Sequence, residues 1–555
     1  MTCQDIRDII NRLPFIKEET PFVLDDQGCL TGEVGILAEG MPTSLRFQTT
    51  ISPSYPFKTN GREPIEFCNP DLIEYPHIME RGNLCLHTSY WTDPLERLES
   101  DFNQLLSWVK KYYIYKETDP HYEHLVVNAS AIDNQIYSIH FTQPSAPIIA
   151  GEFGIATIAD FRNSLYKGFT TKNLLLCSIT KLNTGIKQEK PCSWSSTYLN
   201  LPARICPYLI LASIPGKHNK FAFSDYTELS TYLSSEQKGF LHFFESQQYK
   251  KRRGEIVPIL FGYRIPTGET HWLASLSRIG EFPIEGIAEI KNGVKTGKWT
   301  TEFKNESIIW GLTYDASYDL FFGRGAFDKS FTSKKILIIG IGAIGSIIAR
   351  TLARCGCKDM TVYDYDIKKP ENICRSEYDF ISGVGDKVAE LLNQLSAINP
   401  HLNINSLPVI FDNEIKLHAI TPSAEDKVEE VLNSFDIIFD CSTDDDLMNI
   451  LEGMSLNAKV VNISISNHAS ELVCAFSPTI SRFVHTSFNT IINNDTSDLF
   501  EPSGCWNPTF KASYNDIALM AQYAIRHIYR MLNGDSPTQN FILRDTESGL
   551  KIIKY

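Results

Sequence analysis

The run from Lys335 to Gly345 restricts the fold of this chain more than any other part of the sequence. It opens with Lys335-Ile336-Leu337-Ile338-Ile339, an apolar, β-branched segment typical of a strand buried on both faces of a parallel sheet. Gly340-Ile341-Gly342-Ala343-Ile344-Gly345 follows at once, and a helical pattern continues to Arg354. A strand, a G-x-G-x-x-G turn and a helix direct backbone N–H groups and the positive helix end at a phosphate. The sequence therefore predicts a nucleotide site at Gly340, Gly342 and Gly345.

A second predicted strand, residues 360–363, ends in Asp364, about 19 residues beyond Gly345. An acidic residue at this distance from the glycine turn commonly binds a ribose hydroxyl. The NAD of an oxidoreductase and ATP would both fit the glycines and Asp364, so these residues alone leave the identity of the nucleotide open.

Size and composition limit the class of protein. A chain of 555 residues is too long for one hydrophobic core, so several domains are expected. The net charge of -14 argues against a general nucleic-acid binder. No segment reaches the ~20 apolar residues of a membrane helix, and residues 1–5 lack the features of a signal peptide. Thirteen cysteines without a C-x-x-C pair indicate reduced thiols in the cytoplasm and no zinc site. We therefore expect neither nucleic-acid nor membrane partners.

Residues 1–125 carry an ordered set of aromatic, proline and cysteine positions. The set comprises Tyr55-Pro56-Phe57, Pro64, Tyr75-Pro76-His77, Gly82-Asn83-Leu84-Cys85, Trp91-Thr92-Asp93-Pro94 and a helical pattern over residues 95–113. In type, order and spacing it resembles the ubiquitin-conjugating enzyme fold, which is α+β. The resemblance implies that Cys85 carries a protein tag as a thioester, because a thiolate can accept an acyl group and release it to an amine.

His77 departs from the pattern of that family. It stands where the family's His-Pro-Asn motif has an asparagine. A histidine N–H could stabilise an oxyanion at this place, or the ring could simply fill space. A core cysteine at position 85, in an inactive domain, is the corresponding structural alternative.

Residues 126–330 show β-like apolar segments separated by polar connections, with no repeat and no motif of known chemistry. They predict an α/β connector domain whose role the sequence does not indicate.

Residues 331–555 contain polar residues at informative intervals beyond Asp364. These are Asn372, Arg375 and Lys387, and then Asp440 and Asp444 in Asp440-Cys441-Ser442-Thr443-Asp444. An ATP-dependent adenylation needs such residues, because cations neutralise charge on the α-phosphate and a carboxylate holds Mg²⁺. The set resembles the Rossmann-like adenylation domain of ThiF, MoeB and ubiquitin-activating enzymes. The resemblance implies that Asn372, Arg375 and Lys387 bind the phosphates of ATP, and that Asp444, or else Asp440, binds Mg²⁺.

Cys505 lies in Ser503-Gly504-Cys505-Trp506-Asn507-Pro508, a loop-like segment that precedes a predicted helix near Asn515. A thiol flanked by glycine and proline suits a nucleophile that must reach an acyl adenylate. An ordinary loop cysteine is the alternative interpretation.

The order conjugating-like domain, connector, activating-like domain resembles the bacterial fusion proteins encoded in CBASS antiphage operons. That resemblance implies a homodimer that adenylates the C-terminal carboxylate of a cGAS-like nucleotidyltransferase and passes it from Cys505 to Cys85 and then to a lysine of a target protein. Two other classes stay open. An NAD-dependent oxidoreductase accounts for the glycines and Asp364 but not for Arg375 or Lys387, and a scaffold with an inactive conjugating-like domain accounts for His77. Activation of a sulfur carrier is a neighbouring chemistry, disfavoured by the fused first domain.

Overall fold

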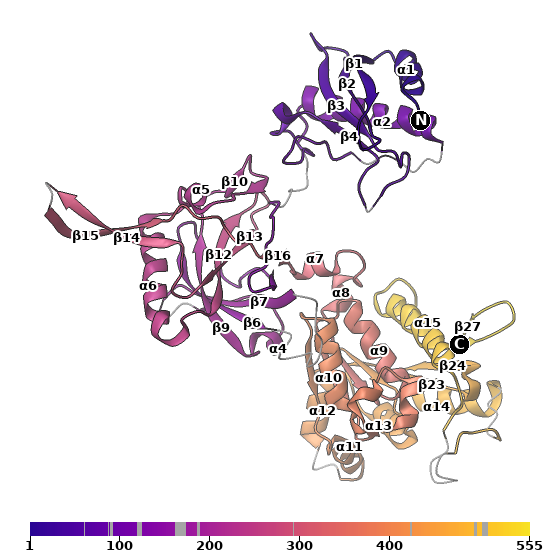
Figure 1. The fold of residues 1–555 in the computed structure, drawn as a ribbon. Helices are drawn as coiled ribbons and strands as arrows, with labels where there is room; N and C mark the ends of the chain where they lie inside the picture. The colour runs from indigo at the N-terminus through magenta and orange to yellow at the C-terminus, as the bar shows by residue number, and fades with distance from the viewer. Residues whose placement is uncertain are drawn as a thin grey trace.

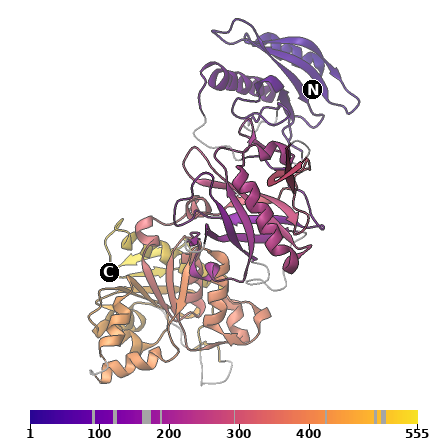
Figure 2. The same ribbon diagram turned by 90° about the vertical axis from the view of Figure 1, so that its left-hand side faces the viewer.

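We analysed a computed structural model, which describes residues 1–555 except 60, 87, 89–92, 119–124, 161–173, 186–188, 292–293, 422–424, 493–496 and 502–508. Three large sheets lie along the chain, and apolar clusters pack against each of them. The N-terminal and C-terminal sheets lie at opposite ends of the molecule, with the sheet of the connector between them (Figures 1 and 2).

The N-terminal sheet is an antiparallel meander in the order β1-β2-β3-β4. Its strands are β1 (Ile16–Leu24), β2 (Leu30–Ile36), β3 (Leu45–Ile51) and β4 (Ile65–Cys68). Helix α1 (Cys3–Arg12) begins at a capping box of Thr2 and Asp5, and α2 (Pro94–Trp108) begins at Asp93, whose side chain accepts from two backbone N–H groups. A π-helical segment, η2 (Val109–Ile114), continues α2. Both α-helices bury apolar residues in the core that the sheet lines.

The connector is built on an eight-stranded mixed sheet in the order β13-β12-β9-β6-β7-β5-β16, with β8 paired to β7. The strands are β5 (Ile136–Phe141), β6 (Phe153–Asp160), β7 (Leu174–Asn183), β8 (Glu189–Pro191), β9 (Ala203–Ile210), β12 (Ile256–Arg264), β13 (Thr270–Arg278) and β16 (Leu312–Asp315). Helix α6 (Ser235–Arg252) packs against β6 and β9.

Two hairpins stand apart from this sheet. The first pairs β10 (Gly216–Lys217) with β11 (Phe221–Ala222), and the second pairs β14 (Ile284–Lys291) with β15 (Val294–Phe303) and extends away from the molecule in Figure 1. Short helices α4 (Ser196–Leu199) and α5 (Tyr226–Ser230) complete the connector. Helices α7 (Tyr318–Phe322) and α8 (Lys329–Thr332) lead into the C-terminal unit, where the Tyr318 hydroxyl donates to the Gly356 carbonyl and Phe331 packs in the core.

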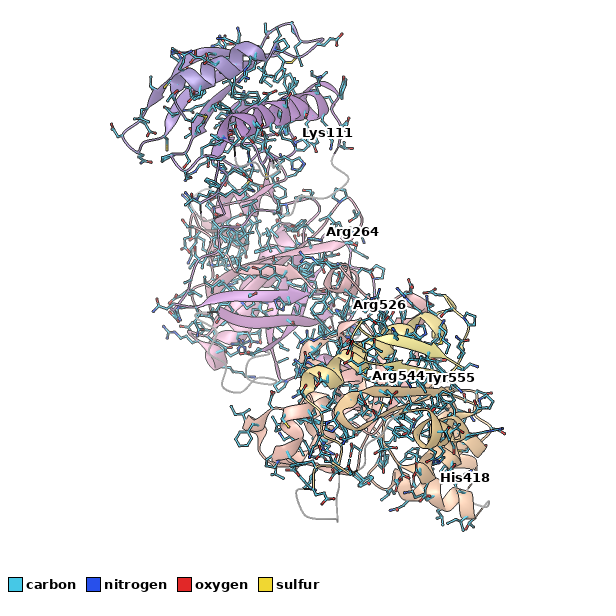
Figure 3. All side chains as sticks on the ribbon, turned by 90° about the vertical axis from the view of Figure 1, so that its right-hand side faces the viewer. Lys111, Arg264, His418, Arg526, Arg544 and Tyr555 are labelled. Carbon is cyan, nitrogen blue, oxygen red and sulfur yellow. The ribbon has the colours of Figure 1, made fainter. Side chains whose placement is uncertain are left out.

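The C-terminal sheet has the order β21-β18-β17-β22-β23-β24-β26-β27. Strands β17 (Lys335–Ile339), β18 (Asp359–Tyr363), β21 (Asn403–Ser406), β22 (Ile437–Asp440) and β23 (Lys459–Ile465) are parallel. The sheet then turns antiparallel with β24 (Glu471–Phe476), β26 (Phe541–Arg544) and β27 (Lys551–Lys554). Arg544, labelled in Figure 3, pairs with Glu471 and joins β26 to β24.

Helices cover both faces of this sheet. Helices α9 (Ala343–Arg354), α10 (Lys387–Ile398) and α15 (Tyr514–Leu532) bury residues in one core. Helices α11 (Phe411–Ile420), α12 (Glu425–Asn433), α13 (Asp445–Gly453) and α14 (Ile480–Thr486) bury residues in the other. The strand order reverses between β17 and β22, and in such sheets ligands bind at the carboxyl ends of the strands on either side of that reversal.

The α/β class predicted from the sequence is confirmed, and the stretch after Lys335 is a strand, a glycine turn and a helix as expected. The ubiquitin-conjugating-like fold of residues 1–125 and the domain limits at 125 and 330 stay predictions. Within the described residues, no helix is both long enough and apolar enough to cross a membrane.

Candidate active site

The glycine turn connects β17 to α9 by close backbone contacts. Gly340 has a φ of +78°, and a Cβ there would lie 2.5 Å from the Cα of Ser442. A Cβ on Gly345 would lie 1.9 Å from the carbonyl oxygen of Gly340, so no side chain fits there. Gly342 differs, because a Cβ at this N-cap residue of α9 would meet no protein atom within 4 Å. Gly340 and Gly345 therefore allow the tight turn, and Gly342 leaves space in front of the helix end.

A cavity of about 350 Å³ opens at this turn, at the carboxyl ends of β17, β18 and β22. Seven of the residues predicted for the nucleotide site line it, which are Gly340, Gly342, Asp364, Asn372, Arg375, Lys387 and Asp444. Gly345 and Asp440 are not among the lining residues and lie behind the wall. The cavity combines a helix N-terminus, three cationic side chains (Lys369, Arg375 and Lys387) and several carboxylates, a set that fits a nucleotide with its phosphates and a divalent cation.

Asp364 is fixed at the end of β18 by the backbone. One of its carboxylate oxygens accepts from Ile341 N at 2.9 Å and the other from Asp366 N at 2.8 Å. The Lys387 ammonium lies 3.9 Å from Asp364 and 2.8 Å from Asp366. Burial raises the pKa of Asp364, although Lys387 and the two N–H donors act to lower it. Lys387, at the start of α10, is thereby held at the cavity by two carboxylates.

Arg375 and Asn372 also line the cavity and lie in a 3₁₀ segment, η3 (Pro370–Arg375). Asn372 Oδ1 accepts from Lys369 N at 2.8 Å and closes the first turn of this segment. The Arg375 guanidinium donates to Thr509 Oγ1 at 2.9 Å and to the Phe510 carbonyl at 3.2 Å. Burial lowers the pKa of Arg375. A predicted phosphate ligand is thus bonded to the segment that directly follows residues 502–508.

Asp444 and Asp440, the two candidates for Mg²⁺, have different surroundings. Asp440 is 1% exposed, and its oxygens accept from Ser442 N, Ser442 Oγ and Asn462 Nδ2. Asp444 lines the cavity, caps α13 by accepting from Leu447 N at 3.0 Å, and pairs with Lys416 at 2.9 Å. Burial opposes ionisation of Asp444, but the Leu447 N–H and Lys416 hold its pKa below the usual value. These surroundings favour Asp444, because its carboxylate faces the cavity as an anion.

Lys416 also contacts Asp412, at 3.2 Å, and Asp412 lines the cavity too. One ammonium therefore stands between two carboxylates of the site. Among the described residues, no group of three or more His, Cys, Asp or Glu side chains is arranged to hold a metal ion. A divalent cation at Asp444 would then depend on phosphate oxygens for further ligands, which is the usual arrangement for Mg²⁺ bound with a nucleotide.

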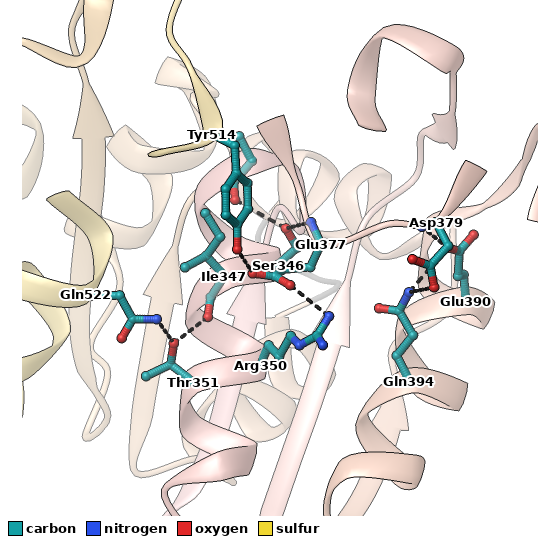
Figure 4. A network of polar contacts seen from close by, with 11 residues as sticks. Ser346, Ile347, Arg350, Thr351, Glu377, Asp379, Glu390, Gln394, Tyr514 and Gln522 are labelled. Carbon is teal, nitrogen blue, oxygen red and sulfur yellow. Dashed lines mark hydrogen bonds and ion pairs between the residues drawn. The ribbon is translucent and has the colours of Figure 1, made fainter. Parts of the chain in front are cut away.

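A polar network anchors the wall that carries Arg375 (Figure 4). Glu377 pairs with Arg350 of α9 at 2.8 Å, donates its backbone N–H to Ser346 Oγ at 3.2 Å and accepts from the Tyr514 hydroxyl. Gln522 of α15 donates to Thr351 Oγ1 of α9 at 2.6 Å. Through Glu377, the segment after Arg375 is tied both to α9 and to the start of α15.

Cys85 and His77 lie together in the N-terminal unit, far from the glycine turn along the chain. Cys85 N donates to the His77 carbonyl at 2.7 Å, and the Cys85 side chain is half-buried. His77 adopts a left-handed backbone with a φ of 59°, and its ring contacts that of Tyr112 at 5.1 Å between centroids. The structure thus brings the two predicted residues into direct backbone contact. Cys505 lies outside the described residues.

Several residues of the site were not predicted from the sequence. Asp366, Asp412 and Phe510 line the cavity, and Lys416 pairs with two of the lining carboxylates. Asp366 was within reach of sequence reasoning, because Asp364-Tyr365-Asp366 places a second acid directly after a predicted strand. Asp412 and Lys416 carry no motif, and only the fold of α11 beside the carboxyl ends of the strands brings them to the site.

A family model and several curated proteins are similar to parts of this chain. Residues 314–475 match the model of the ThiF family. The chain is 28% identical over 274 residues to the ATP-dependent ubiquitin transferase-like protein Cap2 of Enterobacter hormaechei subsp. hoffmannii, covering 47% of this chain and 44% of that protein. It is 29% identical over 137 residues to molybdopterin-synthase adenylyltransferase of Haemophilus influenzae, covering 24% and 51%. The chain thus spans about half or less of these relatives.

Among solved structures, Escherichia coli MccB with ATP is similar over 40% of this chain and 64% of that chain, with 16% identity and a TM-score of 0.29. At that score the likeness carries no argument about fold or function. The family match covers the glycine turn, Asp364, Asn372, Arg375, Lys387 and Asp444. The part of the chain that matches the ThiF family therefore includes most of the residues predicted for the nucleotide site.

Proposed function

We propose that this protein uses ATP to activate the C-terminal carboxylate of a protein and then transfers the acyl group through two of its own cysteines to an amine. The observation that supports the proposal most is the cavity at the glycine turn, where Asp364, Arg375, Lys387 and Asp444 meet within the stretch that matches the ThiF family. The similarity of the chain to a protein named as ubiquitin transferase-like and to an adenylyltransferase also supports the proposal.

In the first step, an oxygen of the substrate carboxylate attacks the α-phosphorus of ATP, and pyrophosphate leaves as the acyl adenylate forms. The turn at Gly342 and the N-terminus of α9 offer backbone N–H groups to the phosphates, and Asp364 is the acceptor for ribose hydroxyls. Arg375 and Lys387 supply positive charge where negative charge develops, and Asn372 shapes their wall. One guanidinium nitrogen of Arg375 donates to Thr509 and Phe510, and the other N–H groups of the guanidinium are donors for a phosphate.

Asp444 is the side chain that would hold Mg²⁺, with Asp440 behind it fixing the turn of Ser442. A bound Mg²⁺ would supply charge neutralisation across the phosphates.

In the second step, the Cys505 thiolate attacks the acyl carbonyl and AMP leaves, which gives a thioester. The Cys85 thiolate then attacks that thioester, and Cys505 leaves as a thiolate. A lysine amine of the target attacks the Cys85 thioester, loses a proton, and forms an isopeptide bond as the Cys85 thiolate leaves. Each thioester exchange conserves one C–S bond, so cleavage of ATP drives the sequence.

His77 is the group in our proposal that assists at Cys85, by a ring N–H directed at the oxyanion. The direct bond between Cys85 N and the His77 carbonyl supports a shared role for the two residues. We further propose a cytoplasmic homodimer whose acyl substrate is a cGAS-like nucleotidyltransferase in antiphage defence, without zinc and without a nucleic-acid partner.

The relay is tested with Cys505→Ala. Given ATP, Mg²⁺ and the nucleotidyltransferase, this variant should form adenylate but no thioester, whereas Cys3→Ala, a change outside the relay, should behave as the wild type. Intact mass and non-reducing gels detect the adducts. Conjugation by Cys505→Ala at the wild-type rate would show that the relay is drawn incorrectly.

Two further measurements separate the alternatives. Exchange of pyrophosphate into ATP, dependent on the protein substrate, excludes an NAD-dependent oxidoreductase. An adduct on Cys85 in the intact-mass spectrum excludes a scaffold with an inactive conjugating-like domain, and its absence in an otherwise active chain favours that scaffold.

A further inference from the structure

The connector reaches the N-terminal unit through the β10–β11 hairpin. The hairpin turns at His218 and Asn219, which have φ values of 53° and 57°, the backbone of a tight turn with two left-handed residues. Lys220 follows the turn, and its backbone carbonyl accepts from Val126 N at 2.8 Å. The hairpin tip is therefore fixed to the rest of the connector where the chain enters it.

Lys220 projects from this hairpin onto the backbone of the N-terminal unit. Its ammonium donates to the Ile73 carbonyl at 3.2 Å and also to the Tyr75 carbonyl. Beside it, His218 lies 3.7 Å from the Glu74 carboxylate. An ammonium with three donors can hold two carbonyls at once, and such charge-assisted bonds are stronger than neutral ones.

The two carbonyls belong to the segment that leads into the Cys85 site. The Tyr75 carbonyl is part of the peptide bond to Pro76, and the Pro76 carbonyl accepts from Trp108 Nε1 at 3.1 Å. His77 follows, with its left-handed backbone, and its carbonyl accepts from Cys85 N. The orientation of successive peptide planes from Ile73 to His77 thus determines where the His77 ring and the Cys85 backbone lie.

We propose that Lys220 is a positioning residue for the Cys85 site, through which the connector sets the backbone of residues 73–77. The inference rests on the proposed function for its biological meaning, but not for its geometry. It assigns a role to the connector: the β10–β11 hairpin completes the support of a site on another unit of the chain. Lys220 touches neither Cys85 nor a substrate in this account and acts through the Ile73 and Tyr75 carbonyls.

Alkylation of Cys85 by iodoacetamide tests this without ATP or a partner protein. The full-length chain is alkylated over a range of pH, and peptide mass spectrometry follows Cys85 with Cys3 as the internal reference. Lys220→Ala should shift the midpoint of the Cys85 rate profile by about half a pH unit or more, because the thiol's surroundings change when residues 73–77 relax. Lys220→Arg should restore most of the wild-type profile, since a guanidinium can also donate to two carbonyls.

Two control variants separate positioning from simple attachment of the units. Lys217 lies on the same hairpin, and its ammonium pairs with Glu228 at 3.2 Å, so Lys217→Ala removes a charge of the hairpin that does not contact residues 73–77. Glu74→Ala removes the contact with His218 at the same junction. Both should leave the Cys85 profile unchanged. A wild-type profile in Lys220→Ala, or an equal shift in Lys217→Ala and Glu74→Ala, would overturn the inference.

The outcome is independent of the proposed function. A shifted alkylation profile in Lys220→Ala, together with a wild-type chain that never conjugates, supports the positioning role and rejects the relay. Where conjugation is observed, transfer from Cys85 to the amine should slow by about tenfold in Lys220→Ala, because small displacements of a reacting group cost rate, while pyrophosphate exchange should not change. An unchanged alkylation profile together with an unchanged transfer rate rejects the positioning role and leaves the relay standing.

Discussion

Asp364 shows how a single carboxylate can be held at a binding site at some cost to its ionisation. Its oxygens accept from two backbone N–H groups, and Lys387 lies 3.9 Å away, yet burial keeps its pKa above the ordinary value. An acid whose pKa is higher in the folded state binds more protons there, so its contribution to stability falls as the pH rises through that pKa. Lys387 limits this loss by its charge.

Replacement of Lys387 by Met should therefore destabilise the C-terminal unit in a pH-dependent way. We expect the free energy of unfolding to fall by about 1–3 kcal/mol at neutral pH, since charged partners lose their hydrogen bonds. The loss should be smaller at pH 4 than at neutral pH, because Asp364, whose pKa is raised, binds protons more readily as the pH falls. Urea unfolding at both pH values measures it, with Lys334→Met as the control, because Lys334 pairs with Asp436 only at 3.9 Å on the surface. An equal loss at both pH values would contradict this account.

Lys416 occupies a position between Asp412 and Asp444 where a divalent cation would be attracted. Asp444→Asn should weaken binding of Mn²⁺ to the ATP-loaded protein by about 10–100-fold, as loss of a metal ligand or its support does. Lys416→Met should strengthen it, because the competing ammonium is gone. Electron paramagnetic resonance of free Mn²⁺ gives both affinities without any turnover. An unchanged affinity for Mn²⁺ in Asp444→Asn would exclude Asp444 as the metal ligand and favour Asp440.

The unit of strand β17, turn and helix α9 is the element that the sequence predicted best. Its apolar run, its glycines and its helical pattern are all local signals, and the structure follows them. Asp412, which lines the same cavity, and its ion-pair partner Lys416 both come from α11 and had no such signal, because tertiary packing alone brings them there. Lys220 had no local signal either, because its contact with Ile73 forms only when the β10–β11 hairpin meets the N-terminal unit.

Two glycines of this element should respond differently to alanine. Gly345→Ala places a Cβ 1.9 Å from the Gly340 carbonyl and should cost about 1–3 kcal/mol of stability through overpacking. The Cβ of Gly342→Ala meets no protein atom within 4 Å, so stability should be nearly unchanged. The affinity for ATP should fall, because the methyl group occupies the cavity. Thermal unfolding and ATP titration of both variants give the comparison. Equal effects on stability would refute the assignment of distinct roles.

At the scale of the whole molecule, the connector and the C-terminal unit meet at His401. The two ring nitrogens of His401 lie 3.1 Å from the Ser193 carbonyl and 2.8 Å from the Ala316 carbonyl, and its ring stacks on Trp194. The Tyr198 hydroxyl donates to the Ser396 carbonyl at 3.0 Å beside it. Burial lowers the pKa of His401, although both carbonyls act to raise it. The neutral ring is therefore favoured in the folded state.

This junction should weaken in acid. A histidine whose pKa is lower in the folded state stabilises the fold above its unfolded pKa, and that stability is lost as the pH falls through the folded pKa. His401→Gln should remove this dependence below about pH 6.5 and should separate the calorimetric transitions of the two units. His485→Gln, an exposed histidine on α14, should do neither. One cooperative transition in His401→Gln at every pH would contradict the expectation.

The anchoring of Ile73 and Tyr75 by Lys220 has a consequence for recombination between related chains. An exchange that brought in only a foreign N-terminal unit would separate these carbonyls from the Lys220 ammonium that holds them in this chain. Chimeras intended to redirect the chemistry to new targets should therefore exchange residues 216–222 together with residues 1–118, although the two segments are far apart in the gene.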